Sequence, residues 1–163
     1  MKESNKRLFS GLIFIAIFIA SLKTHLSFAL LTFIFGLICS FEFNKLLNEK
    51  GYGFYFIFSM IFIYFSITEY YLNSISQTNS FFNDLKDPLL ILSIFVSIFL
   101  VRDLFSSKDL PKFLTKKYVN LIFYISSSFV FIYLIANLNG FFNPFIILGC
   151  FILIWVNDSF AYI

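Results

Sequence analysis

Long apolar runs recur along this chain and constrain its fold more than any other feature. A helix needs about 20 residues to cross the hydrocarbon core of a bilayer, and backbone groups in lipid must be paired within their own segment. The runs therefore predict an all-α, polytopic transmembrane helical bundle of about six spans, several of them short. The runs are Leu8–Leu22, Leu26–Phe41, Phe54–Leu72, Pro88–Val101, Tyr118–Leu138 and Phe141–Val156.

The composition also indicates a surface covered by lipid. Hydrophobic residues make up 60% of the chain and charged residues only 13%, whereas a soluble domain is usually about half apolar and about a quarter charged. So few charges cannot form a solvated surface. The net charge of +3 is small and the basic residues are scattered, which excludes the clustered basic patch of a nucleic-acid partner.

The first two apolar runs are separated by Lys23, Thr24 and His25. A charge near the middle of one long membrane helix is costly, so we expect two spans joined by a tight hairpin, with His25 as a turn residue rather than a metal ligand. Leu8–Leu22 follows basic residues, as the apolar part of a signal peptide does. It lacks a small-x-small cleavage site before Lys23, and we interpret it as an uncleaved first span.

The basic residues predict the orientation of the spans. If the N-terminus is inside and the sides alternate, the outside segments hold only Lys23 and Lys86. The positive-inside rule then places the N-terminus in the cytoplasm, and the sixth span carries Asn157 and Asp158 towards the cytoplasmic side. The other ten of the 12 basic residues fall on the inside: Lys2, Lys6, Arg7, Lys45, Lys50, Arg102, Lys108, Lys112, Lys116 and Lys117.

Acidic residues are rare in the spans and are candidates for function by default. Glu42 ends the second span on the inner side, and Glu69 lies near the outer end of the third, where we interpret it as an interfacial residue. Asp103 follows Arg102 at the inner end of the fourth span, which favours a simple role beside that neighbouring charge.

Asp158 differs because apolar character resumes after it, so that it lies within a hydrophobic stretch. On a helix, Trp155, Asp158 and Tyr162 share a face. A carboxylate in such surroundings needs a cation, a metal or hydrogen-bond donors, and Mg²⁺ prefers such oxygens. The alternative is an aspartate that caps a following helix, with Asn157 assisting. The residues alone leave both interpretations open.

The last nine residues carry a specific pattern. The stretch Trp155-Val156-Asn157-Asp158-Ser159-Phe160-Ala161-Tyr162 fits W-x-x-D-x-x-A-Y and resembles the bacterial phosphatidate cytidylyltransferases, also called CDP-diacylglycerol synthases. Two weaker features resemble the same family in the same order. Lys6–Leu12 is similar to its opening into the first span, and Phe41–Leu47 to the Glu-aromatic stretch that ends its second span.

This resemblance implies a transferase of phospholipid biosynthesis in the bacterial inner membrane, with several spans and a cytoplasmic N-terminus. It implies that CTP and phosphatidic acid, a membrane lipid, react to give CDP-diacylglycerol and pyrophosphate with Mg²⁺ as cofactor. We expect Asp158 to be the catalytic and metal-binding residue, Asn157 and Ser159 to contact substrate, and Glu42 to be a distant third candidate. A homodimer is compatible with the sequence.

Members of the family are longer and continue with a Ser-Pro-Lys-Lys-Thr-like stretch and a signature rich in Gly and Asp that carries metal-binding acids. We therefore expect residues 1–163 to form a single transmembrane domain, the N-terminal part of a truncated enzyme that is inactive alone. Two other classes stay open. A small transporter or flippase subunit would more often show broken helices with paired Gly or Pro, and a structural membrane protein would need no site at all.

Overall fold

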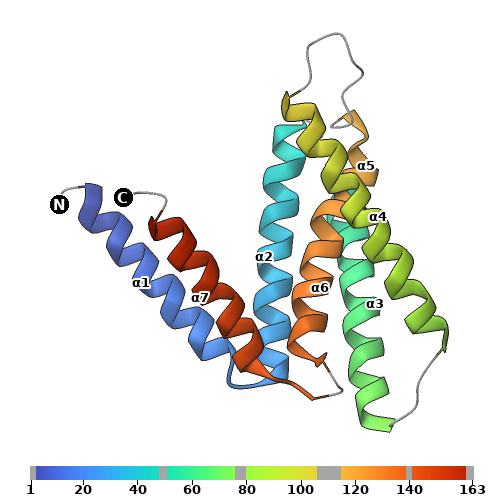
Figure 1. Cartoon of the computed structure of the whole chain (residues 1–163), viewed down its shortest axis with the longest axis horizontal. Helices are drawn as coiled ribbons and strands as arrows, with labels where there is room; N and C mark the ends of the chain where they lie inside the picture. Colours follow the sequence, from blue (N-terminus) through green and yellow to red (C-terminus); the bar gives the residue numbers. More distant parts are fainter. Residues whose placement is uncertain (1–2, 48–50, 76–79, 106–114, 139–140, 161–163) are drawn as a thin grey trace.

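The computed structural model describes residues 3–47, 51–75, 80–105, 115–138 and 141–160, which are almost entirely helical and contain no strand. Eight helical elements follow one another (Figure 1). They are α1 (Glu3–Ser21), α2 (His25–Leu46), α3 (Gly53–Ile75), α4 (Ser80–Phe105), α5 (Lys117–Asn120), the π-helix η2 (Leu121–Ser126), α6 (Ser127–Ala136) and α7 (Pro144–Phe160).

The predicted all-α polytopic bundle is confirmed. By length and composition, four described segments can cross a membrane: His25–Leu46, Gly53–Tyr70, Asp84–Phe105 and Lys117–Ala136. The first and sixth predicted spans are also helical, but their apolar parts are shorter, Gly11–Ser21 and Pro144–Asp158. The expected hairpin between the first two spans is present, since α1 ends at Ser21 and α2 begins at His25.

Two helix starts differ from the predicted spans, and each of these helices contains a proline. The helix α4 begins at Ser80, and Pro88 lies inside it rather than at its start. Proline has no N–H, so it removes one hydrogen bond from that helix without ending it. The last helix begins at Pro144 rather than Phe141, because the fixed φ of proline suits the first position of a helix.

The helix α2 buries one residue in four along a single face, and this face packs on α3 and α6. The spacing of four keeps these side chains on one side of the helix. Gly36 permits a close approach of α3, because a Cβ at this position would overlap the ring of Phe58. Small residues of this kind are common where membrane helices meet. The face consists of Phe28, Thr32, Gly36, Ser40 and Asn44.

The fifth span contains a feature that the sequence did not predict. Residues Leu121–Ser126 form a π-helix between α5 and α6, and this widened segment packs against α2, α3 and α4. A π-helix is rare and depends on its packing surroundings more than on residue type. An apolar run predicts a helix here but cannot show which kind of turn it makes.

The two ends of the bundle differ in what they carry (Figure 1). The N-terminus lies at the same end as the carboxyl ends of α2, α4 and α7, and we call this the motif end because it carries Asn157 and Asp158. The α1–α2 turn, the end of α3 and the starts of α4 and α7 lie at the opposite end, which we call the His25 end. This alternation agrees with the one used to sort the basic residues. Which end faces the cytoplasm stays a prediction.

Candidate functional site

The last turn of α7 carries the residues that the sequence predicted as a site. The side chains of Asn157 and Asp158 are both exposed. Ser159 follows in the same turn of helix, while its side chain, like Tyr162, lies outside the described residues. The structure thus brings Asn157 and Asp158 together at the motif end, as expected for neighbours in sequence.

An aromatic cluster holds α7 against α1. The ring of Phe18 on α1 lies 4.3 Å from the ring of Phe151, centroid to centroid, and 6.1 Å from that of Trp155 in an edge-to-face arrangement. Aromatic pairs at such distances stabilise packing beyond their area alone. Trp155, the first residue of the W-x-x-D pattern, is therefore a packing residue, and Asp158 lies nearly one turn beyond it.

Asp158 occupies the surface of the described bundle. Its apolar neighbours Val156 and Phe160 are also exposed, at 46% and 71%, so the hydrophobic stretch around it faces outward as well. The helix α7 runs on to Phe160. Asp158 therefore lies within α7, and the alternative in which it caps a following helix is wrong because a capping residue stands outside the helical conformation.

The carboxylate of Asp158 has no hydrogen bond or ion pair within the part of the chain that the structure describes, so its oxygens are open to a ligand. The same part contains no group of three or more His, Cys, Asp or Glu side chains that could hold a metal. Mg²⁺ often takes only one or two protein carboxylates and completes its shell with water and substrate phosphates. Asp158 fits the role of one such ligand, and Mg²⁺ itself stays a prediction.

Glu42 and Asp103 are the other acids near the motif end. Glu42 is exposed on α2, and no hydrogen bond or ion pair among the described residues joins it to Asp158. The helix α7 diverges from α2 towards this end (Figure 1). Asp103 accepts a hydrogen bond from Arg102 at 2.8 Å, which confirms the predicted role beside a neighbouring charge. Asp158 is thus the acid in this region with the strongest claim to a ligand.

The polar contacts at the His25 end were not predicted from the sequence. Glu69, expected at the interface, is buried at 7% exposure and pairs with Lys86 of α4 across 3.0 Å. His25, expected to be only a turn residue, begins α2, and its Nε2 lies 2.5 Å from the hydroxyl oxygen of Tyr133. That hydroxyl also lies 3.4 Å from the carbonyl oxygen of Ser66. These contacts link α2, α3, α4 and α6.

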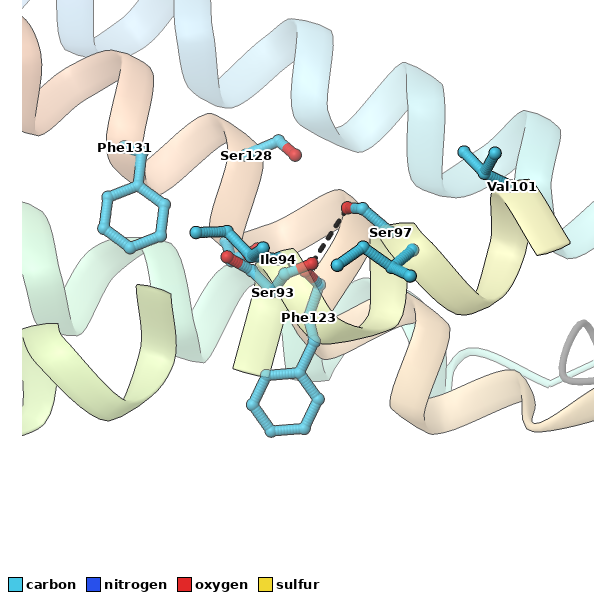
Figure 2. A pocket seen from close by; sticks show the side chains of 9 residues that line it. Ser93, Ile94, Ser97, Val101, Phe123, Ser128 and Phe131 are labelled. Carbon is cyan, nitrogen blue, oxygen red and sulfur yellow. Dashed lines mark hydrogen bonds between the residues drawn. The ribbon is translucent and has the colours of Figure 1, made fainter. Parts of the chain in front are cut away.

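A cavity of about 360 Å³ lies between α4 and the η2–α6 segment, away from both ends. Figure 2 shows serine hydroxyls and aromatic rings around it. The hydroxyls of Ser93 and Ser97 donate to carbonyl oxygens of α4, and that of Ser127 donates to a carbonyl oxygen of η2, as serine often does within a helix. The described residues that line this cavity carry no charged side chain.

The comparisons with known proteins place the chain in one family. A family model described as the cytidylyltransferase family matches residues 5–163. Neither a curated protein nor a solved structure matches the chain. The match includes the α7 motif and nearly all of the bundle, and it supports CTP-dependent cytidylyl transfer, the work of a nucleotidyltransferase with CTP as its substrate. The chain therefore belongs to the cytidylyltransferase family.

Proposed function

We propose that this protein takes part in the transfer of a cytidylyl group from CTP to phosphatidic acid, giving CDP-diacylglycerol and pyrophosphate for phospholipid synthesis. The observation that carries the proposal is the open carboxylate of Asp158 at the end of an apolar membrane helix. The match of the cytidylyltransferase family model to residues 5–163 supports the same proposal. An acid in this place can serve a reaction between a lipid and a soluble nucleotide.

The setting of the motif end supports a lipid acceptor. Val156 and Phe160 are exposed apolar side chains on either side of Asp158, so the acid lies where hydrocarbon and a polar headgroup can both be accommodated. The basic residues Lys45, Arg102 and Lys117 belong to helix ends at the same end of the molecule. Positive charge near a membrane surface attracts anionic lipids and nucleotides.

The reaction requires one bond to form and one to break. An oxygen of the lipid phosphate attacks the α-phosphorus of CTP, and the bond from that phosphorus to the bridging oxygen breaks, so that pyrophosphate leaves. Mg²⁺, when bound, neutralises the charge on the phosphoryl oxygens. We assign Asp158 the role of holding that cation, and Asn157 and Ser159 the role of orienting the substrates by hydrogen bonds. Trp155 and Phe18 keep the end of α7 in place.

The acceptor is tested with the native gene product in membranes and CTP labelled at the α-phosphate. We expect label to enter an organic-soluble product when phosphatidic acid is supplied, and not when diacylglycerol or a lipid alcohol is supplied. Equal labelling with those acceptors would contradict the choice of phosphatidic acid while leaving cytidylyl transfer intact. Loss of labelling with every acceptor would contradict the proposed reaction.

The orientation is tested separately with reporter fusions at Lys112 and Asn79. The positive-inside rule predicts a cytoplasmic reporter at Lys112 and an external one at Asn79. CTP is a cytoplasmic nucleotide, so the motif end must face that side for the reaction to occur. The opposite pair of results would place Asp158 on the wrong side of the membrane for CTP.

A further inference from the structure

The sole histidine of the sequence, His25, lies where four segments of the fold meet. Its ring lies 5.2 Å from that of Tyr133 on α6, 5.6 Å from that of Tyr70 on α3 and 5.8 Å from that of Phe142 before α7, centroid to centroid. Its Nε2 lies 2.5 Å from the hydroxyl oxygen of Tyr133. His25 thereby joins α2 to α3, to α6 and to the segment that leads into α7.

The segment that leads into α7 is held partly by His25. The ring of Phe142 contacts the rings of His25 and Phe28, at 5.8 Å and 5.9 Å between centroids. The N–H of Asn143 donates to the carbonyl oxygen of Ala136 at 2.7 Å. These contacts fix the segment between the end of α6 and the start of α7. A change at His25 would therefore act first on the attachment of α7.

The charged groups around His25 leave little to balance a positive charge on its ring. Glu69 of α3 acts electrostatically on both His25 and Tyr133, but its carboxylate pairs with Lys86 of α4 at 3.0 Å. Lys23, two residues earlier in the chain, is exposed and has the same sign of charge as an imidazolium. The two phenols that contact His25 are uncharged near neutral pH.

The two protonation states of the imidazole differ in how they fit this site. A neutral ring shares one hydrogen with the Tyr133 hydroxyl and brings no charge into a half-buried place. A protonated ring is charged, and a charge in apolar surroundings is costly unless it is paired. The charged ring avoids this cost by turning towards the exposed residues Lys23 and Thr24 at the start of α2, which breaks its contact with Tyr133.

Histidine is the side chain whose ordinary pKa places its change of charge between about pH 5 and pH 8. We propose that the contact between His25 and Tyr133 is a pH-sensitive switch, closed while the imidazole is neutral and opened by its protonation. Opening releases the ring of Phe142 and loosens the start of α7, the helix that carries Asp158. The contact therefore stabilises the bundle near neutral pH, and this stabilisation is lost as the pH falls. The inference does not depend on cytidylyl transfer.

The melting temperature of the native gene product in nanodiscs, measured at about pH 7.5 and about pH 5.5, tests the switch. His25→Gln is the informative variant, because its amide can still bond to Tyr133 but takes up no proton in this range. Loss of one hydrogen bond lowers the melting temperature by about 2–4 °C in a chain of this size. We expect acid to lower the melting temperature of the unaltered protein by about that much more than it lowers that of His25→Gln.

Hydrogen exchange tests whether the opening reaches α7. The amide of Asn143 is bonded to Ala136, so peptides that contain it report on the start of α7. After correction for the intrinsic effect of pH on exchange, their protection should fall about fivefold in acid in the unaltered protein and stay constant in His25→Gln. Peptides around Gly36, where α2 packs on α3, are the control and should not change in either protein.

Two results would overturn the inference. One is the same response to acid in the unaltered protein and in His25→Gln, by either measurement. The other is a higher melting temperature or stronger protection in acid that His25→Gln lacks, since this would show that the site holds the imidazolium better than the neutral ring. Tyr133→Phe decides the matter if His25→Gln does not fold. It removes the hydroxyl partner and should weaken the response to acid, and an unweakened response would contradict the switch.

Discussion

The polar side chains at the two ends of this bundle differ in burial and in pairing. At the His25 end, the Glu69–Lys86 ion pair and the His25–Tyr133 contact link four helices, and Glu69 and Tyr133 are buried at 7% and 1% exposure. At the motif end, Asn157 and Asp158 are exposed, and the described residues give Asp158 no partner. Polar groups that are buried and paired stabilise helix contacts, whereas an exposed, open carboxylate remains available to a ligand.

This contrast indicates two different roles for acidic residues in this membrane protein, stabilising the fold and binding a ligand. Glu69 is buried and forms an ion pair with Lys86 that joins α3 to α4, so its role is to stabilise the fold. Asp158 stabilises nothing within the described residues, so its role must be found in what it binds. The predictions below test whether the separation holds, beginning with the largest expected effect.

The largest effect is expected for Asp158→Asn. Removing the charge should lower CTP-dependent turnover of the native gene product by at least about 100-fold, as when one electrostatic contact in an active site is lost. Expression and thermal stability in detergent should stay unchanged, because the Asp158 carboxylate has no hydrogen bond or ion pair to any described residue. Turnover is measured as transfer of the labelled cytidylyl group to lipid.

The matched control is Asp103→Asn at the same end of the molecule. Asp103 forms an ion pair with its neighbour Arg102, whose side chain is 43% exposed, and ion pairs near the surface contribute less than about 1 kcal/mol. Turnover of this variant should stay within about twofold of the unaltered protein. An equal loss of activity in both variants would show that any negative charge at the motif end matters, not Asp158 in particular.

A smaller effect, and on a different quantity, is expected for Glu69→Gln. The charge-assisted hydrogen bond to Lys86 would be weakened, which should lower the free energy of unfolding by about 2 kcal/mol. Activity per folded molecule should not change. The double variant Glu69→Gln/Lys86→Met should be less destabilised than the two single changes added together, because the pair is lost only once. Additive losses would show that the ion pair does not stabilise the fold.

The smallest effect is expected for Tyr133→Phe. This change removes the hydroxyl beside His25 and nothing else, so the free energy of unfolding should fall by about 1 kcal/mol. Tyr124→Phe is the control, since Tyr124 is exposed at 48% on the neighbouring helical segment. If both variants unfold alike, the contact between His25 and Tyr133 contributes nothing to stability.

The sequence predicted the helices well because lipid leaves an apolar run no alternative to a helix. It could not predict the π-helix at Leu121–Ser126, which is defined by backbone hydrogen bonds in a packed bundle. The same limit applies to His25 and Tyr133, which are 108 residues apart and meet only when α2 packs on α6. Glu69 and Lys86 were both expected on the outer side of the membrane. A shared side does not show that two residues form an ion pair.

The W-x-x-D motif predicted the candidate site, whereas the surroundings of Asp158 were not predicted correctly. The apolar residues around Asp158 suggested a shielded carboxylate, yet Val156 and Phe160 face outward with it. A run of residues shows what neighbours an acid has, but not which face of a helix packs on the rest of the molecule. The W-x-x-D spacing was informative in another way, since Trp155 proved to anchor α7 on Phe18.

The most direct test measures turnover and thermal stability of Asp158→Asn and Glu69→Gln side by side in the same membranes. If the two ends have different roles, the two variants should show opposite effects on turnover and on melting temperature. Asp158→Asn should lose turnover and keep its melting temperature, and Glu69→Gln should keep turnover per folded molecule and melt at a lower temperature. Near-normal CTP-dependent turnover by a stable Asp158→Asn protein would contradict the account, because it would remove Asp158 from the reaction.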